Sequence, residues 1–543
     1  RSLTLAYMGE DGAFRETVIE LSPAPERIDT QADRSVARWH LELEPGAQVE
    51  ILATIEPAIG GRRRPRRRVA TATEELRAAE EQWRSRCTTI ESDNERFNAV
   101  ISRSAQDLRS LVMPAPGGRI LAAGIPWYVA PFGRDALTAA GEALLLNTDL
   151  TADALGVLSG LQAQEDDEWR DAEPGKILHE LRVGELAGAG LIPHTPYYGT
   201  VDATPLFLMR AADHYAWTGD LATMRTLRPS LDAALAWIDR YGDRDGDGFV
   251  EYERRSAHGL QNQSWKDSGD SQRFRDGTLA QTPIAPCEVQ GYVYDAKLRT
   301  AELAREIWRD RPLAERLEQE AAELRRAFNE RFWTEARGGY YVLALDGEKR
   351  QVDSLCSNIG HLLWSGIVPS ERVDVVVDAL MGEELWSGWG VRTMSTGDAG
   401  YNPLSYHNGT VWPHENSLLA QGLARHARWP EAQRIVRRML GASAHFGYQL
   451  PEVFAGLPRA ETPFPIAYPT AARPQAWAAG TPVLLLQVLL GLEPDRRRHE
   501  LETHAPEELP SWAGRSLRLS GIRAFDRQWD VRVDQGRVTV EEV

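Results

Sequence analysis

The chain has 543 residues, with 79 acidic against 62 basic side chains and a formal net charge of −17. This negative surplus repels phosphate backbones and anionic lipid, which argues against nucleic-acid and membrane partners. With 42% hydrophobic and 26% charged residues the composition is that of a globular protein, and no apolar run reaches the roughly 20 residues of a membrane helix.

Cysteine usage indicates a reducing compartment. Cys87, Cys287 and Cys356 lie far apart without Cys-x-x-Cys spacing, so they predict neither a disulfide framework nor a zinc site. No signal-peptide pattern is present, and we expect a cytoplasmic protein. The chain opens without Met in strand-like sequence, which is typical of a processed or truncated product.

Residues 1–60 alternate apolar and polar side chains, which predicts an N-terminal β-sandwich domain or part of one. An Arg/Pro-rich run at 62–68 follows and is interpreted as a solvated connector, with docking of an acidic partner as the alternative. Together with a polar, Glu/Arg-rich helix it forms a predicted linker over 61–93. Residues 505–543 return to alternation, and a small C-terminal β appendage is predicted over 492–543.

Between residues 94 and 491 the sequence is mainly α. The expected helices lie near 94–112, 133–147, 151–164, 202–218, 220–240, 285–307, 311–332, 353–366, 369–380, 408–427, 429–443 and 474–490. Short and long connections alternate, which favours six helical hairpins closed into an (α/α)6 toroid with the long loops at one end. An open solenoid is the alternative, but no fixed repeat period is found.

The long loops are rich in Trp, Tyr and carboxylates, as in the Trp386–Gly390 segment, and this chemistry suits a sugar. Glycoside hydrolysis needs one protonated and one ionised carboxyl group. Asp267, within Trp265-Lys266-Asp267, and Glu452, within Leu450-Pro451-Glu452, are the candidates for these two groups.

The segment Asp243-Arg244-Asp245-Gly246-Asp247-Gly248 begins like a calcium loop. The twelfth position of an EF-hand loop is acidic, whereas here it is Arg254. A tight turn is therefore preferred over a calcium site. No glycine-rich stretch has a phosphate-binding context, and we expect no metal and no cofactor.

Five motifs occur in a familiar order. They are Pro131-Phe132-Gly133-Arg134-Asp135, Trp265-Lys266-Asp267, Tyr406-His407-Asn408-Gly409-Thr410-Val411-Trp412-Pro413, Leu450-Pro451-Glu452 and Pro474-Gln475-Ala476-Trp477. As an ordered set they resemble the amylo-α-1,6-glucosidase (glycogen-debranching glucosidase) family, particularly its bacterial members. The resemblance covers roughly residues 94–491, and the barrel is similar to those of glucoamylase and processing α-glucosidase I.

The resemblance implies roles for single residues. Asp267 matches the family's general acid and Glu452 its general base. Further substrate-binding positions are implied for Trp127, Arg134, Asp135, Asp202, Trp265, Lys266, His407, Trp412, Glu415, Gln475 and Trp477. Glu415 is also the rival base, although a carboxylate at a helix start is favoured by the helix dipole alone. Asp270 is the rival acid, one residue short of a pattern found in related barrels.

The sequence therefore predicts an inverting glycoside hydrolase that releases a terminal sugar, glucose above all, from an α-1,6-linked branch or a small glucoside. A carbohydrate is the only expected partner, and oligomeric state stays open. The alternatives are an exo-α-L-rhamnosidase or another sugar-specific hydrolase on the same barrel, a phosphorylase, and a non-catalytic glycan-binding protein. A carboxylate at Glu452 argues against the phosphorylase, because there phosphate replaces the base.

Overall fold

The computed structural model describes residues 2–63, 69–506 and 508–543. They divide into two compact units, one of residues 1–81 with 183–192 and one of residues 82–182 with 193–543. Helix α1 (Val69–Arg84) runs from the first unit into the second. Residues 64–68, the centre of the Arg/Pro-rich run, lie outside the described residues.

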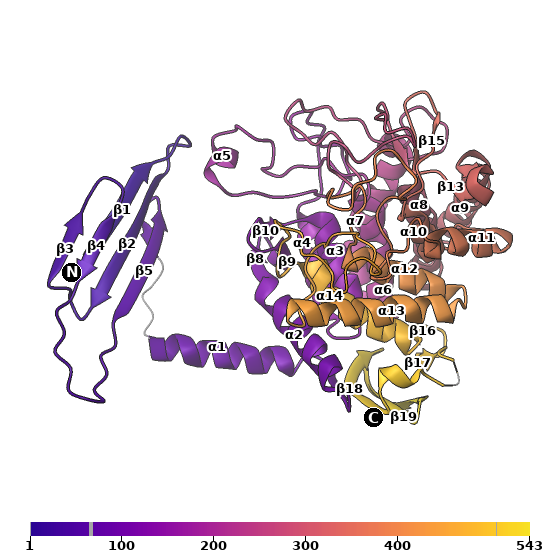
Figure 1. The fold of residues 1–543 in the computed structure, drawn as a ribbon. Helices are drawn as coiled ribbons and strands as arrows, with labels where there is room; N and C mark the ends of the chain where they lie inside the picture. Colours follow the sequence, from indigo (N-terminus) through magenta and orange to yellow (C-terminus); the bar gives the residue numbers. More distant parts are fainter. Residues whose placement is uncertain (1, 64–68, 507) are drawn as a thin grey trace. The chain divides into compact units, whose positions relative to one another are not determined.

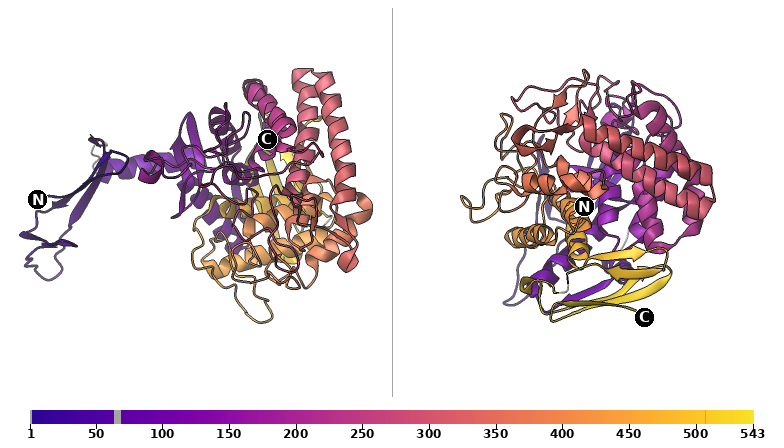
Figure 2. Two further views of the ribbon diagram at one scale, coloured as in Figure 1. Left: turned by 90° about the horizontal axis from the view of Figure 1, so that it is seen from above. Right: turned by 90° about the vertical axis from the view of Figure 1, so that its right-hand side faces the viewer.

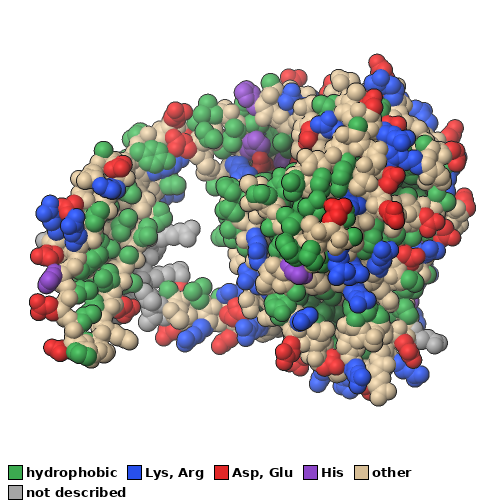
Figure 3. Space-filling view, in the orientation of Figure 1, with side chains coloured by type: hydrophobic (Ala, Val, Ile, Leu, Met, Phe, Trp, Pro, Cys, Tyr) green, Lys and Arg blue, Asp and Glu red, His purple; other side chains and the backbone are tan. Residues whose placement is uncertain are grey.

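The first unit is built on one antiparallel sheet. Its strands are β1 (Ser2–Met8), β2 (Phe14–Ser22), β5 (Leu52–Ile59) and β6 (Arg62–Arg63), paired in that order, and a separate hairpin is formed by β3 (Arg27–Thr30) and β4 (Ser35–Arg38). The alternation of residues 1–60 thus produces strands, and apolar side chains are visible over them in Figure 3. The described strands give this sheet and hairpin where the sequence predicted a sandwich or part of one.

A loop from the middle of the chain belongs to the first unit. It contains the single-turn helix α5 (Glu185–Gly188). The carboxylate of Glu185 accepts hydrogen bonds from the Tyr7 hydroxyl at 3.0 Å and from the Glu10 backbone N–H at 2.7 Å. Residues 183–192 therefore contact strands that precede them by about 175 residues.

Six helices of the second unit pack in a closed cycle. They are α3 (Gly133–Glu142), α6 (Ala203–Thr218), α8 (Cys287–Leu303), α10 (Asn358–Ser365), α12 (Pro413–Arg425) and α14 (Ala476–Leu489). Each packs on the next, and α14 returns to α3. Every residue of α3 and α14 is buried, which explains why these helices lack a polar face.

Six further helices pack outside this cycle (Figure 1, Figure 2). They are α2 (Glu95–Leu111), α4 (Asp149–Gly160), α7 (Leu221–Trp237), α9 (Arg311–Arg331), α11 (Ser370–Met381) and α13 (Trp429–Ser443). Helix α9 is amphipathic, with a buried stripe that includes Ala314, Leu317 and Phe328. Each of the twelve predicted helical segments overlaps one of these twelve helices, although α4 begins two residues before its predicted segment and α11 ends one residue after it. The second unit is helix-rich, as expected.

The long connections all precede helices of the inner cycle. They carry short antiparallel strands: β8 (Val112–Ala115), β9 (Gly118–Gly124), β10 (Tyr128–Pro131), β11 (Ala285–Pro286), β12 (Trp333–Thr334), β13 (Tyr340–Tyr341), β14 (Ala344–Leu345) and β15 (Gln351–Val352). The N-termini of the inner helices and the long loops therefore lie at the same end. Side chains from six loops can meet there.

The C-terminal strands form a hairpin and a sheet. The hairpin pairs β16 (Leu492–Asp495) with β17 (Glu500–Thr503), and the sheet has the order β20 (Arg537–Glu542), β19 (Arg527–Asp534), β18 (Ser516–Ala524), β7 (Thr89–Ser92). Strand β7 comes from the predicted linker, so this edge of the sheet joins residues more than 400 apart in sequence. None of the helices in the described ranges combines the length and apolar character that a bilayer crossing requires.

Candidate active site

Two loop-to-helix junctions place three of the predicted residues together. Arg134 and Asp135 lie in the first turn of α3, and Asp202 directly precedes α6. The Arg134 Nη1 donates to Asp202 Oδ2 at 3.2 Å, and all three side chains are buried. The Thr200 hydroxyl donates to the other oxygen of Asp202 and so fixes this carboxylate from its own loop.

Arg134 also reaches the loop that carries the predicted acid. Its Nη1 donates to the Ser264 carbonyl oxygen at 3.0 Å and its Nη2 to Asp267 Oδ2 at 2.9 Å. The planar guanidinium fork makes these contacts from fixed positions, which a lysine ammonium could not copy. Arg134 is therefore the residue that ties α3, α6 and the Asp267 loop to one another.

Two opposing effects act on the pKa of the Asp267 carboxyl. Burial raises the pKa of this carboxyl, and Arg134 opposes that rise. Its side chain keeps 26% exposure, whereas those of Arg134 and Asp202 keep 6% and none. Asp267 is thus the member of this group that can meet a ligand from solvent.

Glu452 is held by two donors. The Tyr406 hydroxyl donates to Oε1 at 2.6 Å, and the Ala472 backbone N–H donates to Oε2 at 2.8 Å. Burial raises the pKa of Glu452 to about 7, although these hydrogen bonds lower it and the charge of Asp267 raises it further. Glu452 and Asp267 therefore lie within electrostatic reach of each other, as do Asp135 and both of them.

Tyr406 and Tyr128 were not singled out from the sequence. Tyr128 pairs with the Tyr406 hydroxyl, which in turn donates to Glu452. Tyr406 is the first residue of a recognised motif, and Tyr128 directly follows the candidate Trp127. These positions were the available signal, but an aromatic side chain with a hydroxyl is as easily interpreted as a core residue.

Replacing Tyr406 with Phe is expected to move the acidic limb of the pH profile of kcat/KM to higher pH. The hydroxyl favours the ionised form of Glu452, so its loss raises the pKa of that group above about 7. The predicted base works only when it is ionised. As the pH falls, the variant should therefore lose activity at a pH roughly one unit higher than the native chain does, a shift that corresponds to about one hydrogen bond. Profiles of both proteins check this shift.

Tyr468→Phe is the matched control for that experiment. The Tyr468 ring packs on the Tyr406 ring with 5.6 Å between the ring centroids. Removing the Tyr468 hydroxyl takes no hydrogen bond away from Glu452. Its profile should coincide with that of the native chain. An unshifted profile for Tyr406→Phe would show that Glu452 does not set the acidic limb.

Aromatic rings from several loops gather beside the carboxyls. Trp265 contacts the rings of His407, Trp412 and His414 at 5.4–5.7 Å, mostly edge-on. Trp477 stacks on His414 at 3.8 Å. Burial lowers the pKa of His407 and of His414, so both rings are neutral. The His407 Nδ1 also contacts the Ser268 hydroxyl at 2.8 Å, next to Asp267.

Several buried polar atoms near these rings have no hydrogen-bond partner within the described ranges. They are Asp135 Oδ2, Trp265 Nε1, Gln475 Oε1 and Trp477 Nε1. Gln475 also donates from Nε2 to Asp135 at 3.4 Å. A buried polar atom without a partner costs free energy, and water or a ligand hydroxyl removes that cost.

Four of the remaining candidates hydrogen-bond to residues outside this group. Lys266 points its ammonium to the Thr393 carbonyl oxygen and is 1% exposed. Glu415 is fully buried, where it accepts from the Ser357 hydroxyl and contacts His361. Asp270 is half exposed and accepts from Asn408 at 3.0 Å. Trp127 is 56% exposed, with its indole N–H on the Thr470 carbonyl oxygen.

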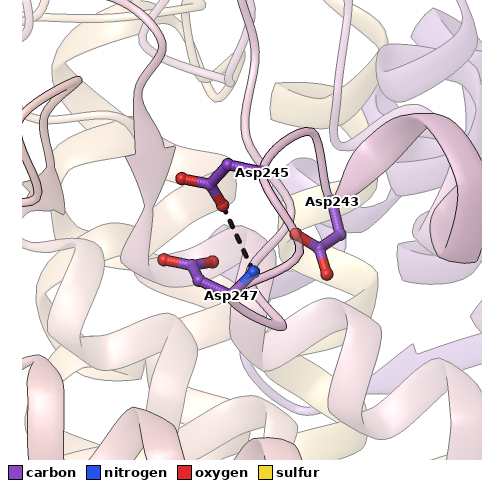
Figure 4. Close-up of side chains that lie close together, drawn as sticks. All are labelled: Asp243, Asp245 and Asp247. Atoms are coloured by element: carbon purple, nitrogen blue, oxygen red, sulfur yellow. Dashed lines mark hydrogen bonds between the residues drawn. The ribbon is translucent and has the colours of Figure 1, made fainter.

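The calcium-like segment is paired with a cationic side chain from another loop. Asp243, Asp245 and Asp247 place one carboxylate oxygen each within 4.8 Å of one another (Figure 4). The Lys349 ammonium, from the turn between β14 and β15, lies 2.9 Å from Asp245 and 2.8 Å from Asp247. It also lies 2.7 Å from the buried Glu251.

Replacing Lys349 with Met is expected to make the segment dependent on calcium. Removing the ammonium leaves adjacent carboxylates without a counter-charge, which destabilises the fold by on the order of 2 kcal/mol. The melting temperature should fall and then recover with millimolar CaCl2, while the native chain and Lys349→Arg respond to neither CaCl2 nor chelator. A native chain that loses stability in chelator would contradict this interpretation.

The described geometry can be compared with known proteins. Residues 166–450, a little over half of the chain, match the family described as mannosylglycerate hydrolase MGH1-like glycoside hydrolase domain. The chain belongs to this glycoside hydrolase family. Residues 1–54 match the N-terminal domain of some glycogen debranching enzymes. No curated protein matches the chain.

Solved structures share the fold of this glycoside hydrolase. A sialidase gives a TM-score of 0.63 at 12% identity over 86% of this chain, which spans only 41% of the sialidase. A GH63 mannosylglycerate hydrolase from Thermus thermophilus in complex with Tris gives 0.54 at 14% identity, covering 71% of this chain and all of the other. A wild-type glycosidase gives 0.50 at 16% identity, covering 73% and 97%.

These findings confirm the expectation of a glycoside hydrolase. The matched family is that of the MGH1-like hydrolases, so the finer resemblance to amylo-α-1,6-glucosidases stays a prediction. The same holds for the roles of single residues in this glycoside hydrolase.

Proposed function

We propose that the chain is an inverting exo-glycosidase that releases a terminal glucose from an α-glucoside, such as an α-1,6-linked branch. The observation that carries the proposal is the pair of carboxyls, the partly exposed Asp267 and the buried Glu452, which lie within electrostatic reach of each other beside the rings of Trp265 and His407. The match of residues 1–54 to a domain of glycogen debranching enzymes supports a glucan as substrate.

We also propose that the cycle of α3, α6, α8, α10, α12 and α14 is the inner ring of an (α/α)6 toroid. Their closed packing supports this, as do the six helices outside them. A ring filled by side chains leaves access only from the end that carries the long loops. A pocket at that end receives the end of a glycan and not its middle.

In the proposed mechanism Asp267 protonates the glycosidic oxygen while Glu452 takes a proton from the attacking water. An inverting pair is separated by roughly 6.5–9.5 Å, which leaves room for that water. Tyr406 and the Ala472 N–H hold both oxygens of Glu452, so the base keeps one orientation. Burial raises the pKa of Glu452 to about 7, which suits a base near neutral pH.

Arg134 has a second part in this mechanism. In the free enzyme it donates to Asp267 and favours the ionised carboxylate. A sugar hydroxyl that takes this donor frees Asp267 to hold the proton that the leaving oxygen needs. The unpartnered atoms of Asp135, Gln475 and Trp477 are available to other hydroxyls of the same sugar.

A second candidate substrate is a small solute of the mannosylglycerate type. The family match and the Thermus thermophilus structure favour it, since both carry that name. It requires the same two carboxyls and differs only in the sugar and in the group that leaves.

A glycoside panel followed by proton NMR tests both candidates. Malto- and isomalto-oligosaccharides and mannosylglycerate are incubated with and without phosphate, and the released sugar is identified. The free sugar should first appear as the anomer opposite to that of the substrate. Release of the same anomer would overturn the inverting mechanism, and a product formed only with phosphate would indicate a phosphorylase.

A further inference from the structure

Four arginines form a basic cluster. Arg434, Arg437 and Arg438 lie on one face of α13, since positions three and four apart are neighbours on a helix. Arg459 comes from the loop that follows Glu452. Burial lowers the pKa of Arg438, and the charges of Arg459, Arg437 and Arg434 lower it further, so the four lie within electrostatic reach. Basic side chains are visible over α13 in Figure 3.

Two buried tryptophans fix this cluster, which we call the α13 arginine cluster. The Arg434 guanidinium lies 4.5 Å from the Trp386 ring and the Arg459 guanidinium 4.8 Å from the Trp389 ring. These rings are only 8% and 3% exposed. The segment Trp386–Gly390 was interpreted from the sequence as a sugar-stacking element. In the structure its two tryptophan rings pack against arginines instead. Stacking limits the side-chain freedom that binding would otherwise remove.

The α13 arginine cluster lacks counter-charges. Within the described ranges no ion pair is formed by any of its four members, whereas Arg428 at the start of the same helix pairs with Asp374 and Glu431. The acid nearest to Arg459 along its loop is Glu461, and that carboxylate acts on Arg392. In a chain with 17 more acids than bases, four unpaired arginines at one place are costly in repulsion.

The loop that carries Arg459 starts and ends at the predicted site. Its ends are joined by a hydrogen bond from Ala455 N–H to the Ile466 carbonyl oxygen. Glu452 lies just before the loop, and Tyr468, packed on Tyr406, lies just after it. A glycan that extends out of the pocket along this loop reaches Arg459 first and then α13.

We propose that the α13 arginine cluster binds anionic groups, carboxylate or phosphate ester, on a glycan whose end occupies the pocket. Guanidinium groups bind both kinds of oxyanion through paired hydrogen bonds, and four charges suit a ligand with several such groups. The claim that the glycan runs from the pocket to the cluster rests on the proposed exo mode. The claim that the cluster binds anionic groups does not. The substrate is thus a charged glycan or one with charged branches.

The structure favours a glycan over a nucleic acid. The net charge of −17 repels a long phosphate backbone outside the cluster. Single-stranded nucleic acids are also held by bases stacked on exposed aromatic rings, and the two tryptophans here are covered by arginines. A single inorganic phosphate would use only part of the cluster.

Equilibrium binding to matched polymers tests the proposal. A labelled carboxymethyl-dextran and unmodified dextran of the same length are titrated with the native chain and with a variant carrying Arg434→Gln, Arg437→Gln, Arg438→Gln and Arg459→Gln. The native chain should prefer the charged polymer, and the variant should lose at least about tenfold in affinity for it, the equivalent of about one charge-assisted contact. Hydrolysis of a small neutral glycoside should stay within about twofold.

A second variant controls for net charge. Arg305, Arg311, Arg316 and Arg518 are exposed and paired with acids, so changing all four to Gln removes the same charge from other places. This control should lose less than about threefold. Equal losses in both variants, tighter binding of a DNA oligomer, or full competition by inorganic phosphate would each overturn the proposal. Hydrolysis absent from the native chain and from both variants, with binding of the charged polymer by the native chain intact, would overturn the proposed function alone.

Discussion

Replacing Glu452 with Gln is expected to abolish hydrolysis of every glycoside that the native chain accepts. An amide cannot take a proton from water, and no leaving group removes the need for that base in an inverting reaction. The loss in kcat should be on the order of a hundredfold or more for both oligosaccharides and nitrophenyl glycosides. Steady-state kinetics on one substrate of each kind measure it.

The fold should tolerate this substitution. Burial raises the pKa of Glu452 to about 7, above the value of an exposed Glu, so ionising it in the folded state costs free energy as the pH rises past the ordinary value of about 4.3. Gln removes that cost, and the melting temperature at neutral pH should be unchanged or higher. A fully active Glu452→Gln beside an inactive Glu415→Gln would move the base to α12.

Replacing Asp267 with Asn is expected to separate substrates by their leaving groups. Without the acid, hydrolysis of an oligosaccharide should fall by on the order of a hundredfold or more, because its leaving oxygen departs only when protonated. A glycosyl fluoride or nitrophenyl glycoside needs little or no protonation and should keep part of its rate. The ratio of the two rates is the measurement.

Asp270→Asn provides the matched control. Asp270 lies three residues further along the same loop, is half exposed and accepts from Asn408. It should hydrolyse both kinds of substrate at nearly the native rate. If Asp270→Asn spares only activated substrates while Asp267→Asn behaves like the native chain, the acid has been assigned to the wrong residue.

The helical part of the fold could be predicted because its signal is local. Most helices of the second unit have their own apolar pattern of period 3.6, and each predicted segment overlaps one helix. Strand β7 is an element that local sequence patterns could not predict. Its four residues, Thr89–Ser92, carry too little pattern, and they become a strand only because β18 pairs with them from the other end of the chain.

The candidate site also has one part that could be predicted from the sequence and one part that could not. Motifs located Arg134, Asp267 and Glu452 because their ordered set resembles a known family. The groups that hold them were not located. The Ala472 N–H and the Ser264 carbonyl oxygen are backbone groups without a sequence signal, and Tyr406 was given no role although it lies in a recognised motif. Lys349 is a similar case, since nothing in its neighbours along the chain indicates three carboxylates from another loop.

The closed cycle of inner helices has a consequence for synthesis. Gln475, at the start of α14, donates to Asp135 of α3 across 340 residues of sequence, and α14 is the helix that closes the cycle onto α3. At translation rates of about 5–20 residues per second, that span takes on the order of tens of seconds to make. During this time α3 has an apolar side without its partner. The nascent chain therefore passes through a long open stage in which it is without activity and prone to aggregate.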